Sequence, residues 1–333
     1  MRNIRFGVIG TNWITERFLA GAKHHKQFEL AAVYSRTEEK AAEFAAKHDI
    51  PHRYTELDAM FASGVIDAVY IASPTSYHAA HAIAAMNHGI HVLCEKPAAS
   101  NAREMKEMIE TAKRTDTLLM HAMKSTLMPG FGAVRDNLER IGTVRRFFAS
   151  YCQYSSRYDA YKAGQVLNAF KPELSNGSLM DIGIYCIYPA VVLFGRPASV
   201  KAQAYMLESG VDGEGSLLLG YEGMDAVLMH SKITNSFVPN EIQGELGNLY
   251  VDRISEPESV ELRLRGGASE DLSRPTIEDN MYYEVEEFIG LLKEGLRESS
   301  TNSHEASLIT MEIIDEARGQ IGLKFPADEA AGG

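Results

Sequence analysis

The sequence predicts an α/β protein with a doubly wound parallel sheet in its first part and a large, mainly antiparallel sheet in its second part. Short apolar runs alternate with helix-like stretches from residue 4 to about residue 124, as in successive βαβ units. Strand-like runs and turn pairs instead follow one another between residues 198 and 265, which indicates antiparallel pairing. We therefore expect two domains, at residues 1–124 and 125–333, joined without a long linker.

The composition is that of a globular protein with an acidic surface. Of its 333 residues, 45% are hydrophobic and 23% charged, and the formal net charge of −12 argues against nucleic-acid or anionic-membrane partners. No apolar run approaches the roughly 18 residues of a membrane span, and no signal-peptide pattern follows the first residues. Cys94, Cys152 and Cys186 are too scattered for a disulfide framework or a zinc site. We expect a reduced, cytoplasmic protein that holds no structural metal.

The elements of the first part follow from their periodicity and their end signals. Thr37 and Ser100 are suited to cap the helices that follow them, and Gly89 is suited to end the helix before it. We expect strands at residues 5–9, 28–34, 67–72, 92–94 and 118–123. We expect helices at residues 13–24, 37–48, 56–62, 77–88 and 101–115.

The turn after the first strand is a candidate pyrophosphate site, because backbone N–H groups at a strand-to-helix turn bind anions. The G-x-G-x-x-G fingerprint falls on Gly10, Asn12 and Thr15, so only its first glycine is present. Asparagine tolerates a positive φ, so the turn can still form. A plain strand–turn–helix is the alternative, but the place of this turn at the head of the βαβ series favours a cofactor site. The predicted contacts are Gly7, Gly10, Thr11, Asn12, Trp13 and Ile14.

Ser35 and Arg36 follow the second strand, where an NAD site commonly has an aspartate or a glutamate. A guanidinium and a hydroxyl suit the 2′-phosphate of NADP, which a carboxylate would repel. These two residues therefore favour NADP, with NAD as the alternative cofactor. The competing interpretation of Arg36 is a loop side chain in solvent.

The loop after the strand at residues 67–72 lies at the same sheet edge, which is where ligands of open α/β sheets bind. Pro74 stiffens this loop, and Thr75 and His78 are placed to contact the ribose or the nicotinamide. A packing or capping role is the alternative for His78. The predicted cofactor contacts of this loop are Ser73, Pro74, Thr75 and His78.

Glu95, Lys96 and Pro97 come at the carboxyl end of the strand at residues 92–94. Pro97 fixes its own φ and disfavours helical backbone at Lys96, so the lysine is held on stiff backbone at the ligand edge. A solvated charge pair is the usual explanation of an arbitrary Glu-Lys. The neighbouring loops instead favour a proton-handling role for Lys96, with Glu95 and Lys96 also close to the cofactor.

The second part begins with a helix at residues 130–140 and a strand at 143–153. Residues 155–176 are irregular and polar; such a segment often contacts substrate, with solvated surface as the alternative. A mostly apolar helix then runs to residue 194. We expect strands at 200–206, 215–221, 226–233, 240–244, 249–252 and 260–264, then helices at 281–294 and 303–318, the last ended by Gly319.

Asp181 and Tyr185 are four residues apart and therefore share one face of the apolar helix. A carboxylate and a phenol in an apolar setting need polar partners. A tyrosine alone on a buried helix is usually a packing residue, but an acid one turn before it favours a functional site.

These motifs together resemble the Gfo/Idh/MocA family (glucose–fructose oxidoreductase and inositol dehydrogenase) along nearly the whole chain. The resemblance depends on residues 7–10, 73–78, 89–97 and 181–185, of which the G-x-H-V-L-C-E-K-P stretch is the most specific. It implies a Rossmann-type domain followed by an α/β domain whose large sheet joins many members into dimers or tetramers. The tyrosine at position 185, four residues after Asp181, makes this sequence similar to the branch with trans-dihydrodiol dehydrogenase and NADP-dependent D-xylose dehydrogenase. In that branch the tyrosine is the acid/base.

The resemblance implies an oxidoreductase that moves a hydride between a nicotinamide and a secondary alcohol or carbonyl of a small sugar, polyol or diol. Tyr185 would take the alcohol proton, Lys96 would stabilise the developing alkoxide, and Asp181 would orient Lys96 or the substrate. NAD(P)-binding regulators and NAD-dependent glycoside hydrolases of the same fold are the alternatives. The presence of both the lysine and the tyrosine favours a dehydrogenase.

Overall fold

The computed structural model describes residues 2–329 and divides them into two compact units. Within the described residues, the first unit combines residues 2–124 with Ile277–His304, and the second combines Ser125–Thr276 with residues 305–329. The expected boundary at residue 124 therefore coincides with the first passage of the chain between the units. In addition, a segment from late in the chain returns to the first unit.

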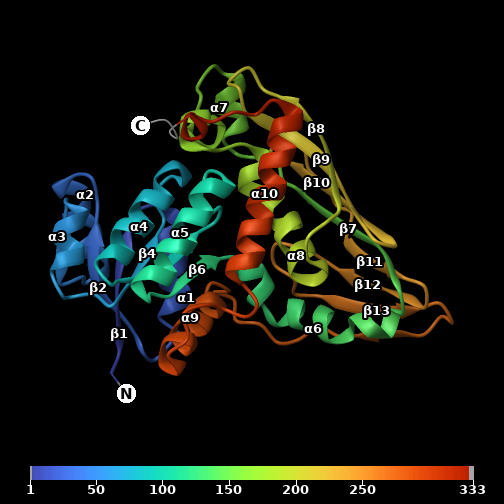
Figure 1. The fold of residues 1–333 in the computed structure, drawn as a ribbon, viewed down its shortest axis with the longest axis horizontal. Helices are drawn as coiled ribbons and strands as arrows, with labels where there is room; N and C mark the ends of the chain where they lie inside the picture. The colour runs from blue at the N-terminus through green and yellow to red at the C-terminus, as the bar shows by residue number, and fades with distance from the viewer. Residues whose placement is uncertain (1, 330–333) are drawn as a thin grey trace. The chain divides into compact units, whose positions relative to one another are not determined.

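The first unit is built on a six-stranded parallel sheet in the order β3-β2-β1-β4-β5-β6, which confirms the predicted doubly wound topology (Figure 1). Its strands are β1 Ile4–Ile9, β2 Phe28–Tyr34, β3 His52–Tyr54, β4 Ala68–Ile71, β5 His91–Glu95 and β6 Leu119–Ala122. Its helices are α1 Trp13–Ala22, α2 Glu38–His48, α3 Leu57–Ala62, α4 His78–Asn87, α5 Ala102–Thr115 and α9 Tyr282–Glu294.

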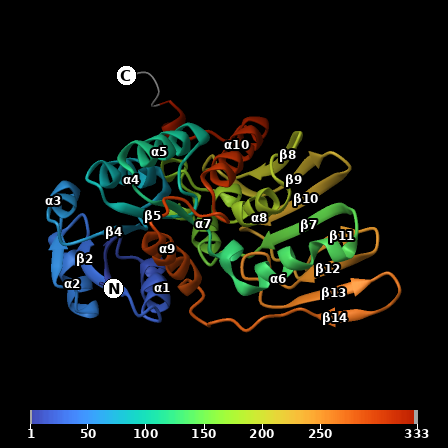
Figure 2. The same cartoon turned by 60° about the horizontal axis from the view of Figure 1, so that its bottom comes forward.

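Helices cover both faces of this sheet. Figure 2 shows α4 and α5 along one side of β4 and β5, with α1 and α9 along the other. The buried Phe6 ring of β1 lies 6.3 Å from Phe18 of α1 and 5.6 Å from Phe288 of α9, measured between centroids. A Cβ on Gly21 of α1 would come within 2.6 Å of the Tyr282 nitrogen, so the two helices meet at a glycine. Helix α9 is therefore part of the first unit's core.

Two predictions in this unit are corrected. The short strand β3 was not expected, because its sequence His-Arg-Tyr lacks an apolar run and its first two residues are exposed. The N-cap of α5 is Asn101 rather than Ser100. The Asn101 side chain accepts from the Glu104 N–H, and the Glu104 side chain accepts from the Ser100 N–H. An acid placed three residues after the cap completes this reciprocal arrangement.

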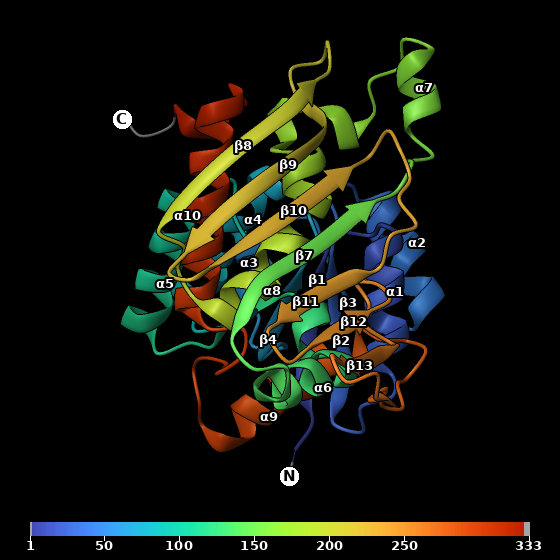
Figure 3. The same ribbon diagram turned by 90° about the vertical axis from the view of Figure 1, so that its right-hand side faces the viewer.

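The second unit contains an eight-stranded sheet in the order β14-β13-β12-β11-β7-β10-β9-β8 (Figure 3). Its pairs are antiparallel except for β7 with β10, which confirms the mainly antiparallel prediction. The strands are β7 Val144–Cys152, β8 Ser199–Met206, β9 Asp212–Tyr221, β10 Met224–Ser231, β11 Asn240–Gly244, β12 Gly247–Val251, β13 Val260–Leu264 and β14 Ser269–Asp271. The helices are α6 Pro129–Asn137, α7 Tyr158–Lys162, α8 Ile184–Phe194 and α10 His304–Ile321.

One face of this sheet packs on α8 and on the π-helical segment Leu179–Gly183 that precedes it (Figure 3). A single α-helix was expected over this stretch, but i→i+5 bonding widens its first turn, as often occurs at functional sites. The stretch Pro172–Phe194 is long and apolar enough to cross a membrane by length and composition, contrary to the expectation from the sequence. Because 72% of its most apolar window is buried inside the protein, we interpret it as a core segment.

Three smaller differences complete the comparison in this unit. The segment 155–176 contains the short helix α7, whose residues are all at least partly exposed. Strand β14 was not expected, because its three residues are exposed and polar. Helix α10 passes through Gly319 and continues to Ile321, where Gly322 has a φ of +75° and ends it.

Candidate functional site

Three loops of the first unit leave adjacent strands at one edge of the parallel sheet. They follow β1, β4 and β5, which are neighbours in the strand order. The order of the strands reverses between β1 and β4, and ligands of open α/β sheets bind at such a switch point. The predicted contact Gly7 instead lies inside β1, where a Cβ would meet Ile66 at 3.1 Å. The other first-unit site residues predicted from the sequence lie on or beside these loops or the loop after β2.

The turn after β1 is held tightly against the end of β4. Gly10 has a φ of +110°, and a Cβ placed on it would lie 2.7 Å from the carbonyl oxygen of Ala72. Thr15, at the third fingerprint position, is buried and donates its hydroxyl to the Gly10 carbonyl at 3.0 Å. The turn therefore keeps the close backbone approach of a dinucleotide site with one glycine, and it fits a pyrophosphate at the N-terminus of α1.

Asn12 does not adopt the positive φ that we expected. Its φ of −99° and ψ of 177° are extended, and it is the N-cap of α1. Its side-chain oxygen accepts from the N–H groups of Ile14 and Thr15, and its amide donates to Ala72 O at 2.8 Å. Asn12 therefore replaces the second glycine as a side-chain connection between the α1 turn and β4.

The loop after β2 presents Ser35 and Arg36 as predicted. Ser35 is buried, with its N–H donating to Tyr54 O at 3.1 Å, whereas Arg36 is exposed. The first carboxylate beyond them, Glu38, lies 2.5 Å from the guanidinium of Arg53. An exposed guanidinium next to a serine hydroxyl suits a phosphate monoester, such as the 2′-phosphate of NADP.

His78 connects the loop after β4 to the turn after β5. Its Nε2 is 2.6 Å from Ser73 O, and its Nδ1 is 2.8 Å from Pro97 O. Burial lowers the pKa of His78. The hydrogen bonds to the two carbonyl oxygens favour the protonated ring and raise the pKa, but their effect is smaller. His78 is thus a buried bridge that positions Pro74 and Thr75, rather than a side chain presented to the cofactor.

The Glu95 and Lys96 side chains have opposite surroundings. Glu95 is buried and accepts from Tyr70 Oη at 2.5 Å and from the Lys96 N–H at 3.0 Å, and burial raises its pKa. Lys96 is half-buried, and its peptide bond to Pro97 is cis. The carboxylate therefore anchors the strand end inside the unit, and the lysine is the group of the pair with access to a ligand.

In the second unit, Asp181 and Tyr185 stand out by their exposure. They are the two residues between 179 and 191 that are not buried. This pattern indicates a common face, with Asp181 on the π-helical segment and Tyr185 in the first turn of α8. The Tyr185 ring packs edge-on against Tyr151 of β7, with centroids 5.5 Å apart.

Sequence reasoning missed Lys232, which directly follows β10. Its Nζ lies 2.6 Å from Asp181 Oδ2, and its side chain is 4% exposed. We had expected Asp181 to orient Lys96 or the substrate, and the described contacts give it this second lysine as a partner. A lysine between Ser231 and Ile233 at the end of an apolar strand was the available signal, but a strand-end lysine usually lies in solvent.

The start of the π-helical segment is fixed by buried polar groups from β9 and β10. Asp212 Oδ2 accepts from the Leu179 N–H at 2.6 Å, and His230 Nδ1 lies 2.9 Å from Ser178 Oγ. Burial raises the pKa of Asp212 to about 6 and lowers that of His230 to about 3. Gly177 is required here, because a Cβ would approach Asp212 Oδ1 to 2.2 Å at a φ of +136°.

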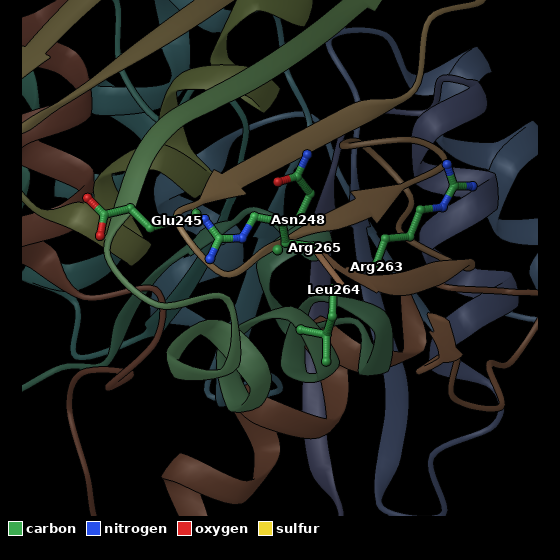
Figure 4. A pocket seen from close by; sticks show the side chains of 7 residues that line it. Glu245, Asn248, Arg263, Leu264 and Arg265 are labelled. Atoms are coloured by element: carbon green, nitrogen blue, oxygen red, sulfur yellow. The ribbon is translucent and has the colours of Figure 1, made fainter. Parts of the chain in front are cut away.

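A depression of about 340 Å³ on the second unit is unrelated to these residues (Figure 4). Two of its charged side chains, Arg263 and Glu245, are already paired. Arg263 contacts Glu261 at 2.7 Å and stacks over Tyr250, and Glu245 accepts from Arg145 at 2.6 Å. The depression lies along β11–β13 and contains no predicted site residue.

Comparison with known proteins decides the family. Residues 4–123 match the GFO_IDH_MocA profile, described as an oxidoreductase family with an NAD-binding Rossmann fold, and residues 135–250 match the GFO/IDH/MocA C-terminal domain. The NADP-dependent scyllo-inositol 2-dehydrogenase IolU of Bacillus subtilis is 58% identical over 98% of this chain and 100% of its own length. The chain belongs to the Gfo/Idh/MocA family.

Other family members span the same length. Trans-1,2-dihydrobenzene-1,2-diol dehydrogenase of Xenopus tropicalis is 31% identical over 90% of this chain and 91% of its own. The crystal structure of aldose–aldose oxidoreductase from Caulobacter crescentus has a TM-score of 0.85 at 21% identity, covering 96% of this chain and 97% of that one, which shows the fold. This Gfo/Idh/MocA member is an NAD(P)-dependent oxidoreductase for alcohol or carbonyl groups of small sugars, polyols or diols.

Proposed function

We propose that the protein oxidises one ring hydroxyl of an inositol or a similar cyclic polyol to a ketone, with NADP as its preferred cofactor. The observation that carries this proposal is the full-length, 58% identical relative whose name gives both scyllo-inositol and NADP. The Ser35–Arg36 loop supports the cofactor, because it offers a cation and a hydroxyl where an NAD site has an acid.

In the proposed reaction the cofactor, when bound, accepts the hydride. Tyr185 takes the hydroxyl proton of the substrate, and Lys96 supplies a positive charge that favours the phenolate and the developing alkoxide. Asp181, held by Lys232, accepts a hydrogen bond from another substrate hydroxyl. Lys96 lies in the first unit, and Asp181 and Tyr185 lie in the second.

The test is a substrate panel with NADP and NAD, in which reduction of the nicotinamide is followed by absorbance. It should include scyllo-inositol, myo-inositol, D-xylose, D-glucose and a cyclic trans-diol. We expect the highest kcat/KM for an inositol with NADP. An equal or higher kcat/KM for one of the aldoses, D-xylose or D-glucose, would contradict the inositol proposal. Tight cofactor binding without turnover of any substrate would favour a regulator. Cofactor that copurifies, with glycoside cleavage and no net absorbance change, would favour the hydrolase.

We further infer that the open face of the eight-stranded sheet joins copies of the chain into a dimer or tetramer in the cytoplasm. Tyr205 of β8, Leu218 of β9 and Met229 of β10 are exposed there at 60%, 45% and 38%. Such apolar side chains on a sheet face favour burial against another copy. Light scattering tests the assembly: a monomer in the wild-type protein, or an unchanged assembly in Leu218→Glu, would contradict this inference.

A further inference from the structure

Lys232 is a buried ammonium with three neighbours in the second unit. Its Nζ contacts Asp181 Oδ2 at 2.6 Å and the carbonyl oxygen of Ala169 at 3.3 Å, and it lies 5.3 Å from the centroid of the Phe170 ring. An ammonium that has left water requires a charge partner and additional acceptors, since its desolvation is otherwise uncompensated. Asp181 provides the charge, Ala169 the second acceptor, and Phe170 an electron-rich face.

The same residue is fixed through its backbone. The Lys232 N–H donates to Gly213 O at 2.9 Å, and its carbonyl accepts from the Ser155 N–H at 2.8 Å. Lys232 therefore contacts the beginning of the segment 155–176 through its backbone and the later part of that segment through its side chain. This is the segment in which we expected substrate contacts, so one residue connects it to Asp181.

Two other buried titratable groups contact the start of this helix. Asp212 accepts from the Leu179 N–H and also interacts electrostatically with Lys232, and His230 contacts Ser178. The Asp181 side chain, in contrast, keeps 31% of its surface exposed while Lys232 holds one of its oxygens. A carboxylate that is charge-compensated from inside and partly open outside is suited to accept hydrogen bonds from a neutral hydroxyl compound, because the ammonium fixes its direction.

We propose that Lys232 is a positioning residue for the dehydrogenase reaction, which holds Asp181 as an oriented acceptor for a polyol hydroxyl and couples it to the segment 155–176. This inference rests on the proposed function. It adds a second lysine to the site, with a task different from that of Lys96: Lys232 acts through Asp181 and does not touch the reacting atoms.

The experiment is a double-mutant cycle on the full-length protein with Lys232→Met, Asp181→Asn and the combined variant. We measure kcat and KM for the best inositol of the panel, the Kd of NADP and the unfolding midpoint. Lys232→Met should lower kcat/KM on the order of 10- to 100-fold through a coupled pair, with the Kd of NADP unchanged. In the Asp181→Asn background the same substitution should cost less than about 3-fold, because no carboxylate remains to be positioned.

Two further variants separate positioning from general structural damage. Arg318→Met removes another buried cation of the second unit, which pairs with Asp315 and Asp328, and it should leave kcat/KM near the wild-type value even where it lowers the unfolding midpoint. Lys232→Arg keeps the charge and should recover part of the loss. Equal losses from Lys232→Met in both backgrounds, or an equal loss in Arg318→Met, would overturn the proposal. Wild-type protein without polyol turnover would overturn the proposed function instead, and the positioning role with it.

Discussion

The two units hold their candidate site residues in different ways. In the first unit the cofactor edge is mainly backbone: a glycine turn, a capped helix start and two loops tied together by His78. In the second unit the candidate site consists mainly of side chains. Asp181 is held there by Lys232, which lies 51 residues away in the sequence. Backbone sites depend on local conformation and tolerate some exchange of residues, whereas a buried ion pair depends on both partners.

The strongest test of this comparison concerns the two groups that we assign to proton transfer. Tyr185→Phe should lower kcat by about 10²- to 10⁴-fold, with little change in the Kd of NADP, because positioned acid/base groups contribute that much. Lys96→Met should do similar or greater damage. The double variant should lose much less than the product of the single losses, because the two groups act as a unit.

Tyr188→Phe is the matched control for the tyrosine. Tyr188 is on the same helix, is buried, and its hydroxyl lies 3.0 Å from Ser307 Oγ. Its removal should affect the unfolding midpoint more than kcat. Turnover near the wild-type level in Tyr185→Phe would remove the acid/base assignment and direct attention to Tyr158 and Tyr161 of the neighbouring segment.

The next largest effect is expected at the cofactor phosphate. Arg36→Ala should weaken NADP binding on the order of 10- to 100-fold, because a hydrogen bond to a charged group contributes roughly 1.5–3 kcal/mol. NAD binding should be almost unchanged, since NAD lacks the 2′-phosphate. The control is Arg53→Ala, which removes an exposed arginine of β3 that pairs with Glu38 of α2. An unchanged NADP-to-NAD ratio of Kd values in Arg36→Ala would show that the preference has another origin.

A smaller effect is expected for the buried anchor of the first unit. Tyr70 stacks on Phe18 with centroids 3.7 Å apart and donates to Glu95, so Tyr70→Phe keeps the ring and removes the donor. The free energy of unfolding should fall by about 1–3 kcal/mol, because a buried carboxylate loses a partner. Denaturant unfolding measures this change. A loss no larger than that of Tyr77→Phe, at a tyrosine that is 46% exposed, would contradict the anchoring role.

The smallest expected effect concerns Asn12. It tests whether the backbone turn of the first unit tolerates exchange of residues. Because Asn12 is an N-cap, Asn12→Ala should destabilise by about 1 kcal/mol, whereas Asn12→Gly should cost only a few tenths. NADP affinity should follow the same order, since the cap fixes the N–H groups of the turn. Higher stability in Asn12→Val than in Asn12→Gly would contradict the capping role.

The sequence contained most of what is local in this molecule. Strand β2 and helix α2 have the predicted C-terminal ends, and Gly10 and Lys96 lie at the predicted sheet edge. These features depend on periodicity, turn residues and the order of elements along the chain. The capping role of Asn12 was within reach, since asparagine favours caps as much as positive φ.

What was missed depends on contacts between distant residues. Lys232 and Asp181 are each ordinary in their own surroundings, and only the packing of the π-helical segment on β10 brings them together. Helix α9 likewise has no sequence feature that assigns it to the first unit. Its place depends on Phe288 meeting Phe6 and on Tyr282 meeting Gly21, pairs separated by more than half of the chain.

The return of residues 277–304 to the first unit limits how this enzyme can be recombined with its relatives. An exchange of cofactor-binding parts at residue 124 would give the new α1 a foreign α9. If residues 1–124 of this chain were joined to the second part of a relative, the α9 of that relative would have to supply a ring that packs on Phe6 and a backbone that fits against Gly21. Cofactor preference should therefore be easier to change through substitutions in loops such as Ser35–Arg36. Replacement of the whole first part should give a folded protein only when residues 277–304 are transferred together with it.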